Sequence, residues 1–157
     1  MNILLTCVGK TQASYLKEGI QEYEKRLKHY TKFDLNYLPD LKNAKHLKKE
    51  AIKQAEGEII LNKRVKGDFL ILLDEKGKEY TSPNFAQYLQ KLMLNSHKTV
   101  HFVIGGAYGF SPDVYNAANG KIALSQMTFS HQMVRLIFVE QLYRAFSILN
   151  NEPYHHN

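Results

Sequence analysis

Residues 69–74, FLILLD, form a nearly continuous apolar run. Apolar residues at successive positions, rather than at every second one, predict a strand that is buried on both faces, as in a parallel sheet. Residues 2–9, NILLTCVG, and residues 100–106, VHFVIGG, have the same character. The three runs predict the centre of a parallel sheet that helices cover on both faces.

The segments around these runs carry helical and further strand patterns. Apolar residues recur at intervals of three and four in two long segments, and Ser-Pro pairs mark helix starts at Ser82 and Ser111. The predicted helices cover residues 11–30, 43–62, 82–95, 112–119 and 131–150, and the further strands cover residues 33–39 and 121–125. Strands alternate with helices throughout, so residues 1–157 are predicted to form a single α/β domain with a mainly parallel sheet.

The helix predicted over residues 43–62 has two distinct sides. The residues predicted to point inward are Leu47, Ala51, Ala55 and Ile59. A basic stripe on another side consists of Lys42, Lys45, Lys49 and Lys53. Such a stripe fits either a solvated helix face or a surface that contacts phosphates, and charge alone leaves both open.

Composition limits the class of protein. The chain has a formal net charge of +6, and its whole surplus of basic residues lies in residues 1–66. This asymmetry suits a polyanionic partner such as nucleic acid, or simply favours solubility. No apolar run approaches the roughly 18 residues that span a bilayer, and the first residues lack the features of a signal peptide, so we expect a cytoplasmic protein with no membrane partner. Cys7 is the only cysteine, which excludes a disulfide within the chain.

A glycine-rich loop with Gly105, Gly106 and Gly109 follows the last of the three apolar runs. Its spacing matches neither the triphosphate-binding loop nor the G-x-G-x-x-G fingerprint of dinucleotide-binding folds. Ligands of parallel sheets bind at the carboxyl ends of the strands, here the loops that follow Leu73, Ile104 and Ser125. The glycines therefore either let the main chain approach a ligand such as an adenosine, or form a tight connection.

The last predicted helix, residues 131–150, is apolar on nearly every side. One face of a small sheet cannot cover so much apolar surface, which predicts a homodimer through this C-terminal helix. Arg135 lies on an apolar side, where an unpaired cation is costly, so we expect it to meet an acid, a backbone carbonyl or a ligand. Arg144 is expected to pair with Glu140, one helical turn earlier.

Several motifs resemble those of the ribosomal large subunit pseudouridine methyltransferase H family, which belongs to the SPOUT methyltransferases. The longest is LSQMTFSHQMVRLIFVEQLYRAFSI at residues 124–148. The others are LLTCVGK at residues 4–10, YEKRL at residues 23–27, VIGGAYGF at residues 103–110 and PYHH at residues 153–156. The resemblance extends from Met1 to the C-terminal tail.

The resemblance implies a fold and a reaction that spacing alone does not. It implies a C-terminal trefoil knot, a homodimer, and S-adenosyl-L-methionine as methyl donor, with no metal ion. The reaction of the family is methylation of N3 of a pseudouridine in 23S rRNA on the assembled ribosome. Matched onto this sequence, the cofactor contacts are Leu73, Gly105, Leu124, Ser125, Gln126, Met127, Thr128 and Phe129.

The reacting nitrogen must also lose its proton, and four side chains are candidates for the catalytic work. They are His131, Arg135, Tyr154 and His155. A histidine could take the proton, and an arginine could stabilise the anionic ring. Only the resemblance assigns the polar tail to the substrate, and this chain has His156 where family tails carry Arg or Lys, which weakens any phosphate contact at neutral pH.

Two other functions stay open. A ribosome-associated RNA-binding protein could keep this fold without performing chemistry. A SPOUT methyltransferase could instead act on tRNA. Labelling of intact ribosomes, free 23S rRNA and tRNA side by side separates the three functions.

Overall fold

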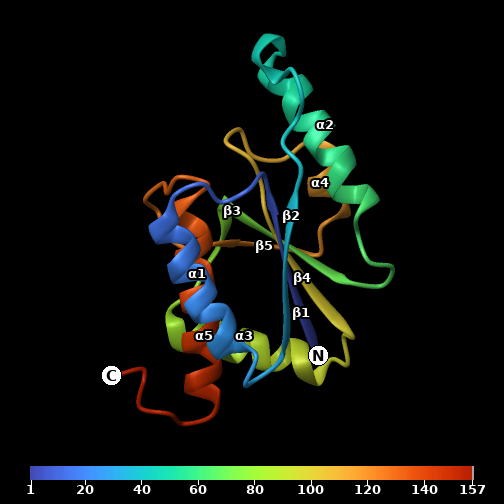
Figure 1. Ribbon diagram of the computed structural model, residues 1–157. Helices are drawn as coiled ribbons and strands as arrows, with labels where there is room; N and C mark the ends of the chain where they lie inside the picture. The colour runs from blue at the N-terminus through green and yellow to red at the C-terminus, as the bar shows by residue number, and fades with distance from the viewer. Residues whose placement is uncertain (157) are drawn as a thin grey trace.

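The computed structural model describes residues 1–156 and contains one sheet of five parallel strands (Figure 1). The strands are β1 (Asn2–Val8), β2 (Lys32–Leu38), β3 (Phe69–Glu79), β4 (Thr99–Ile104) and β5 (Gly120–Ala123). Their order across the sheet is β2-β1-β4-β3-β5, and every neighbouring pair is parallel. The predicted α/β class is confirmed, and the three apolar runs form the centre of the sheet.

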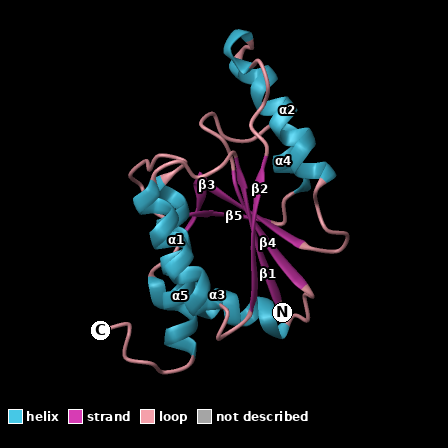
Figure 2. Ribbon diagram, viewed as in Figure 1, coloured by secondary structure: helices cyan, strands magenta, loops and turns pink. Residues whose placement is uncertain are grey.

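Helices cover both faces of the sheet, as the sequence predicts (Figure 2). One face carries α1 (Ser14–Leu27), α3 (Ser82–Leu94) and α5 (Met133–Leu149), and α5 packs against both of the others. The other face carries α2 (Lys49–Asn62) and α4 (Pro112–Ala117), which pack against each other. Of the helices in residues 1–156, none is long and apolar enough to cross a membrane.

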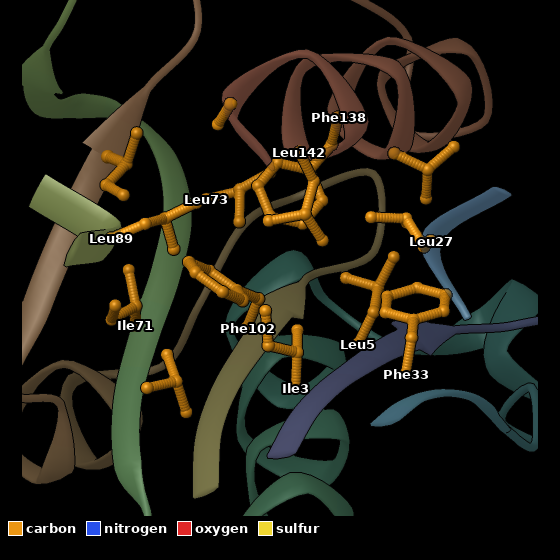
Figure 3. Packing of buried hydrophobic residues seen from close by; sticks show 14 of the residues in the cluster. Ile3, Leu5, Leu27, Phe33, Ile71, Leu73, Leu89, Phe102, Phe138 and Leu142 are labelled. Carbon is orange, nitrogen blue, oxygen red and sulfur yellow. The ribbon is translucent and has the colours of Figure 1, made fainter. Parts of the chain in front are cut away.

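The main core lies between the sheet and the layer of α1, α3 and α5 (Figure 3). Phe102 of β4 and Phe138 of α5 are fully buried at its centre, with ring centroids 4.9 Å apart. Leu142 of α5 and Leu73 of β3 belong to the same cluster. Since Leu73 is the last buried residue before β3 reaches solvent, the core directly supports the carboxyl end of the sheet.

The apolar surface of α5 is used largely within the chain. Because α5 lies between α1 and α3 and over the sheet, its buried side chains face three directions at once. A second subunit is expected where the sheet alone covers this helix, but α1 and α3 cover much of it here. The homodimer therefore stays a prediction, and so does the knot.

The predicted helix over residues 43–62 is wrong at its beginning. Asn43 has a left-handed backbone (φ 58), Lys48 is extended, and a short 3-10 helix, η1 (Ala44–His46), replaces the first turn. Leu47 and Ala51, predicted to point inward, are exposed. The reason is that η1 and the first part of α2 project beyond the sheet, where no layer covers them (Figure 1).

The two Ser-Pro pairs differ in how they cap their helices. The Ser111 hydroxyl accepts a hydrogen bond from the Val114 N–H and caps α4, as predicted. The last helix begins at Met133 rather than at residue 131, with Gln132 as its N-cap, and the Ser130 hydroxyl accepts a hydrogen bond from the Met133 N–H at 3.0 Å in the preceding turn. Helix α3 is capped by the Thr81 hydroxyl rather than by Ser82. The Ser82 hydroxyl instead donates to Gln141 Oε1 of α5 at 2.7 Å.

A buried polar network crosses the sheet near the amino ends of β3 and β4. His101 Nδ1 lies 2.8 Å from Asp68 Oδ2, and His101 Nε2 lies 2.8 Å from the Thr6 hydroxyl. The Arg64 Nε donates to the other Asp68 oxygen at 2.6 Å. His101 and Asp68 are almost completely buried, so their polar atoms depend on each other for partners.

This network predicts a loss of stability in mild acid. Burial lowers the pKa of His101 below its ordinary value of 6.5, although the Asp68 carboxylate opposes the shift. Below pH 6.5 His101 therefore binds a proton more readily in the unfolded chain than in the folded chain. As a result, the free energy of unfolding falls as the pH drops from 7 to 5. His101→Gln is expected to make this pH dependence shallower and to lower the free energy of unfolding at pH 7 by about 1–3 kcal/mol. Urea unfolding at a fixed protein concentration measures both changes. An unchanged pH dependence in the variant would show that His101 is not the group responsible.

Candidate functional site

A cavity of about 640 Å³ opens at the carboxyl ends of β3, β4 and β5. Three segments that are remote in the sequence form its walls: residues 73–76, residues 104–110 and residues 124–131. The size lies within the range of small-molecule sites. Of the predicted cofactor contacts, the cavity is lined by Leu73, Gly105, Leu124, Ser125, Met127, Thr128 and Phe129. Gln126 is not part of the lining, and its side-chain amide lies 3.4 Å from Glu79.

The glycine loop is shaped by two protein neighbours. A Cβ atom at Gly105 would lie 3.1 Å from the Phe110 ring, and one at Gly106 would lie 2.6 Å from the Glu56 carboxylate of α2. The absence of a side chain at Gly106 leaves room for the Glu56 carboxylate, which is the flexible end of its side chain, so this contact fits either explanation of the glycines. Burial raises the pKa of Glu56, as does the nearby Asp40 carboxylate, while the Gly106 N–H opposes the shift.

Asp74 is a cavity residue that the sequence analysis missed. The pairing of β3 with β5 is interrupted between Leu73 and Lys78, so the residues between them leave the ladder and turn into the cavity. The Tyr115 hydroxyl donates to Asp74 Oδ2, and the Lys76 N–H donates to Oδ1 at 2.8 Å. Its position directly after the apolar run of β3 is the signal that could have identified it.

The residues that line the cavity fit the chemistry of S-adenosyl-L-methionine, the cofactor that the resemblance implies. Leu73, Ile104 and Leu124 give apolar walls for an adenine ring, beside main-chain groups of the glycine loop. The carboxylates of Asp74 and Glu75 suit a ligand that carries positive charge at a sulfonium and an ammonium group. Lys53 and Lys76 also line the cavity and suit the carboxylate end of the same ligand.

His131 is the one catalytic candidate that lines this cavity. It precedes α5 and is half-buried. Burial lowers its pKa, the nearby Arg135 charge lowers it further, and Asp40 opposes both. The imidazole is therefore unprotonated at neutral pH and can accept a proton.

Arg135 lies outside the cavity lining and is 1% exposed. Its guanidinium donates to the main-chain oxygens of Val8 (2.7 Å), Gly9 (2.9 Å) and His131 (2.9 Å), and to the Thr11 hydroxyl (3.1 Å). No carboxylate within residues 1–156 forms an ion pair with it. Of the three partners expected from the sequence, the backbone carbonyl is confirmed.

The tail lies at the other end of α5 (Figure 1). The Tyr154 hydroxyl lies 3.0 Å from that of Tyr23 and donates to Glu140 Oε1 at 3.1 Å, and the Arg144–Glu140 ion pair is confirmed at 2.6 Å. His155 Nδ1 lies 3.4 Å from the Arg144 guanidinium. An α-helix rises about 1.5 Å per residue, so Glu140 is about 13 Å along the helix from His131. Within one chain, Tyr154 and His155 therefore do not reach the cavity that His131 lines.

The described residues hold no cluster of three or more histidine, cysteine, aspartate or glutamate side chains in a metal-binding arrangement. The polar groups of the cavity instead bond to one another and to the main chain, as at Asp74. The arrangement can therefore bind an organic cation and accept a proton with residues of this chain.

Comparison with known proteins identifies the family of the chain. Residues 1–155 match the family described as predicted SPOUT methyltransferase. Proteins named ribosomal RNA large subunit methyltransferase H are 57% identical in Parabacteroides distasonis, 58% in Flavobacterium psychrophilum and 56% in Flavobacterium johnsoniae, each over 156 residues and 99% of both chains. The chain therefore belongs to the SPOUT methyltransferases and, among them, to the ribosomal RNA large subunit methyltransferase H family.

Proposed function

We propose that this protein uses S-adenosyl-L-methionine to methylate N3 of a pseudouridine in 23S rRNA on the assembled ribosome. The observation that carries the proposal is that three strand-end segments together form one cavity in a member of the SPOUT methyltransferases. The names of the relatives, which specify ribosomal RNA of the large subunit, support the substrate. Such a substrate is a cytoplasmic assembly, so the protein acts in the cytoplasm.

The residues of the cavity divide the work of holding the cofactor. Leu73 and Leu124 contact its apolar parts, and the main chain of the loop at Gly105 supplies polar contacts. Asp74, held by Tyr115, attracts its positive charge. When bound, the cofactor supplies an electrophilic methyl group on sulfur. The predicted contacts Ser125, Gln126, Met127, Thr128 and Phe129 belong to the segment that closes the cavity.

An unprotonated ring nitrogen of His131 accepts the proton that N3 of the base loses. The electron pair that stays on N3 then forms the bond to the methyl group. Most of the remaining rate enhancement comes from holding the two reacting atoms close together and in line. Arg135 is a positioning residue, because its guanidinium ties the main chain of His131 to the end of β1.

In the proposed homodimer, the tail of one subunit completes the cavity of the other. Tyr154 and His155 lie far from the cavity of their own chain, so in the homodimer the tail of one subunit contacts RNA at the cavity of its partner. Mixing a tail-truncated subunit with a Gly105→Val subunit tests this arrangement, because only the mixed dimer holds one complete site. Recovery of activity in the mixture is expected, and its absence would contradict the shared site.

The knot is part of the same proposal. β5 lies at the edge of the sheet, yet Gln132, nine residues after its end, bonds to the main chain of Lys10 (3.1 Å) and Gln12 (3.0 Å) beyond β1. Residues 124–131 therefore cross the carboxyl ends of β3 and β4. A C-terminal segment threaded through a loop would take this path, which is a rare exception to unknotted topology.

The proposed reaction is tested by transfer of a labelled methyl group to three RNAs. Label is expected in 23S rRNA of intact ribosomes and not in free 23S rRNA or tRNA, and ribosomes with uridine in place of the pseudouridine measure the specificity for that base. Label in tRNA alone would indicate a tRNA enzyme. Binding to ribosomes without any transfer would indicate an RNA-binding protein that performs no chemistry.

A further inference from the structure

Four exposed lysines extend from the outer tip of α2 toward the cavity. We call Lys42, Lys45, Lys48 and Lys49 the lysine arm. Residues 42–53 contain five lysines in all and a single acidic residue, Glu50. The arm is therefore a strongly basic stretch of the surface.

One end of the arm lies beside the cavity. η1 and the first turns of α2 project from the end of the sheet at which the cavity opens (Figure 1). The Lys49 ammonium lies 5.4 Å from the centre of the Tyr108 ring, and Tyr108 lines the cavity. One turn further along α2, Lys53 lines the cavity itself. A ligand that extends from the cavity past Tyr108 therefore meets Lys49, the arm lysine nearest to the cavity.

No carboxylate of the described residues neutralises the charges of the arm. Within residues 1–156 the four lysines form no ion pair, whereas Lys53 is paired with Glu50 at 3.0 Å. Leu47 and Tyr108 are 45% and 47% exposed beside them. Cations interleaved with exposed apolar and aromatic side chains are the composition of a surface that binds nucleic acid.

We propose that the lysine arm binds phosphate groups of the ribosomal RNA that flank the methylated nucleotide. The inference rests on the proposed function and adds to it the surface that positions the RNA. Phosphate contacts fix the register of an RNA without reading its sequence. The arm thus aligns the substrate at the mouth of the cavity, while the cavity performs the chemistry.

The test compares two triple variants of the full-length protein with the same change of charge. Lys42→Gln/Lys45→Gln/Lys48→Gln alters the arm and leaves Lys49 beside Tyr108 unchanged, and Lys66→Gln/Lys91→Gln/Lys98→Gln alters exposed lysines toward the amino end of the sheet. For the arm variant, KM for intact ribosomes is expected to rise roughly tenfold. The slope of log KM against log salt is expected to fall by about 2 or 3, because binding releases fewer counterions when phosphate contacts are lost. Its kcat at saturation and its affinity for S-adenosyl-L-methionine stay at the wild-type values.

The outcomes separate this inference from the proposed function. If wild-type protein methylates ribosomes but both variants have the same KM and salt slope, the arm does not bind RNA. If wild-type protein transfers no methyl group to any RNA, the proposed function fails instead. A photo-crosslinker attached through Lys45→Cys is expected to label 23S rRNA, and labelling of a ribosomal protein alone would overturn the assignment of the arm to RNA.

Discussion

Arg135→Met is expected to lower the free energy of unfolding by about 3–5 kcal/mol, close to what is lost when one partner of a buried charged contact is removed. Methionine keeps much of the length and apolar volume of the side chain. It leaves the buried main-chain oxygens of Val8 and Gly9 without their donors, and each such group costs about 1–3 kcal/mol. Urea unfolding at one fixed protein concentration measures the loss, because the stability of the proposed dimer would depend on protein concentration.

Arg144→Met is the matched control, since it makes the same change nine residues later on the same helix. Arg144 pairs with Glu140 one turn away on a partly exposed surface, and such pairs contribute about 0.3–0.5 kcal/mol. If the two variants lost similar amounts of stability, the hydrogen bonds of Arg135 to the end of β1 would not be what holds α5 in place. Arg135→Lys is expected to fall between them, because an ammonium cannot reach all four acceptors.

The sheet could be predicted because burial on both faces leaves a direct trace in the sequence. The runs at residues 69–74 and 100–106 have no polar side, as expected of strands that helices cover on both faces in a parallel sheet. The order of the strands leaves no comparable trace, since it depends on which strand edges pair. Local patterns therefore predicted the elements and the end of the sheet that holds the site.

The first turns of α2 show where periodicity fails. Leu47 and Ala51 have helical spacing, but a spacing rule assumes that a layer lies beneath the helix, and here the segment projects beyond the sheet. Glu56 was missed for a related reason, because its partner Gly106 lies fifty residues later in the sequence. Contacts of this kind depend on the tertiary fold and not on any local pattern.

The resemblance assigned the four catalytic candidates to one site, but within a single chain only His131 lines the cavity. His131 follows the segment that lines the cavity, so its place could be inferred from the chain itself. Tyr154 and His155 fold back onto Tyr23 and Arg144 at the far end of α5. A resemblance transfers positions in a sequence, and whether those positions meet within one subunit or across two is a matter of tertiary and quaternary structure.

His131→Gln is expected to lower kcat for methyl transfer by roughly 10²–10⁴, the usual contribution of a positioned general base. Glutamine keeps a polar side chain of similar reach but cannot take the proton, so KM for the cofactor is expected to change little. Burial and the Arg135 charge lower the pKa of His131 below 6.5, so the kcat of the wild type should stay level at neutral pH and fall only in acid below that value. Kinetics at saturating ribosomes between pH 5 and 8 measure both effects.

His29→Gln controls for the loss of an imidazole, because His29 is exposed and lies outside the lining of the cavity. His155→Gln tests the rival base, which in the proposed dimer would reach the cavity from a partner subunit. One outcome is that His155→Gln removes the acid limb of the pH profile, whereas His131→Gln keeps the acid limb and a kcat within a few-fold of the wild-type value. In that case the tail accepts the proton, and His131 serves only the turn before α5. If His131→Gln alone removes the acid limb, the base belongs to the chain that forms the cavity, and the partner's tail is left with positioning the RNA.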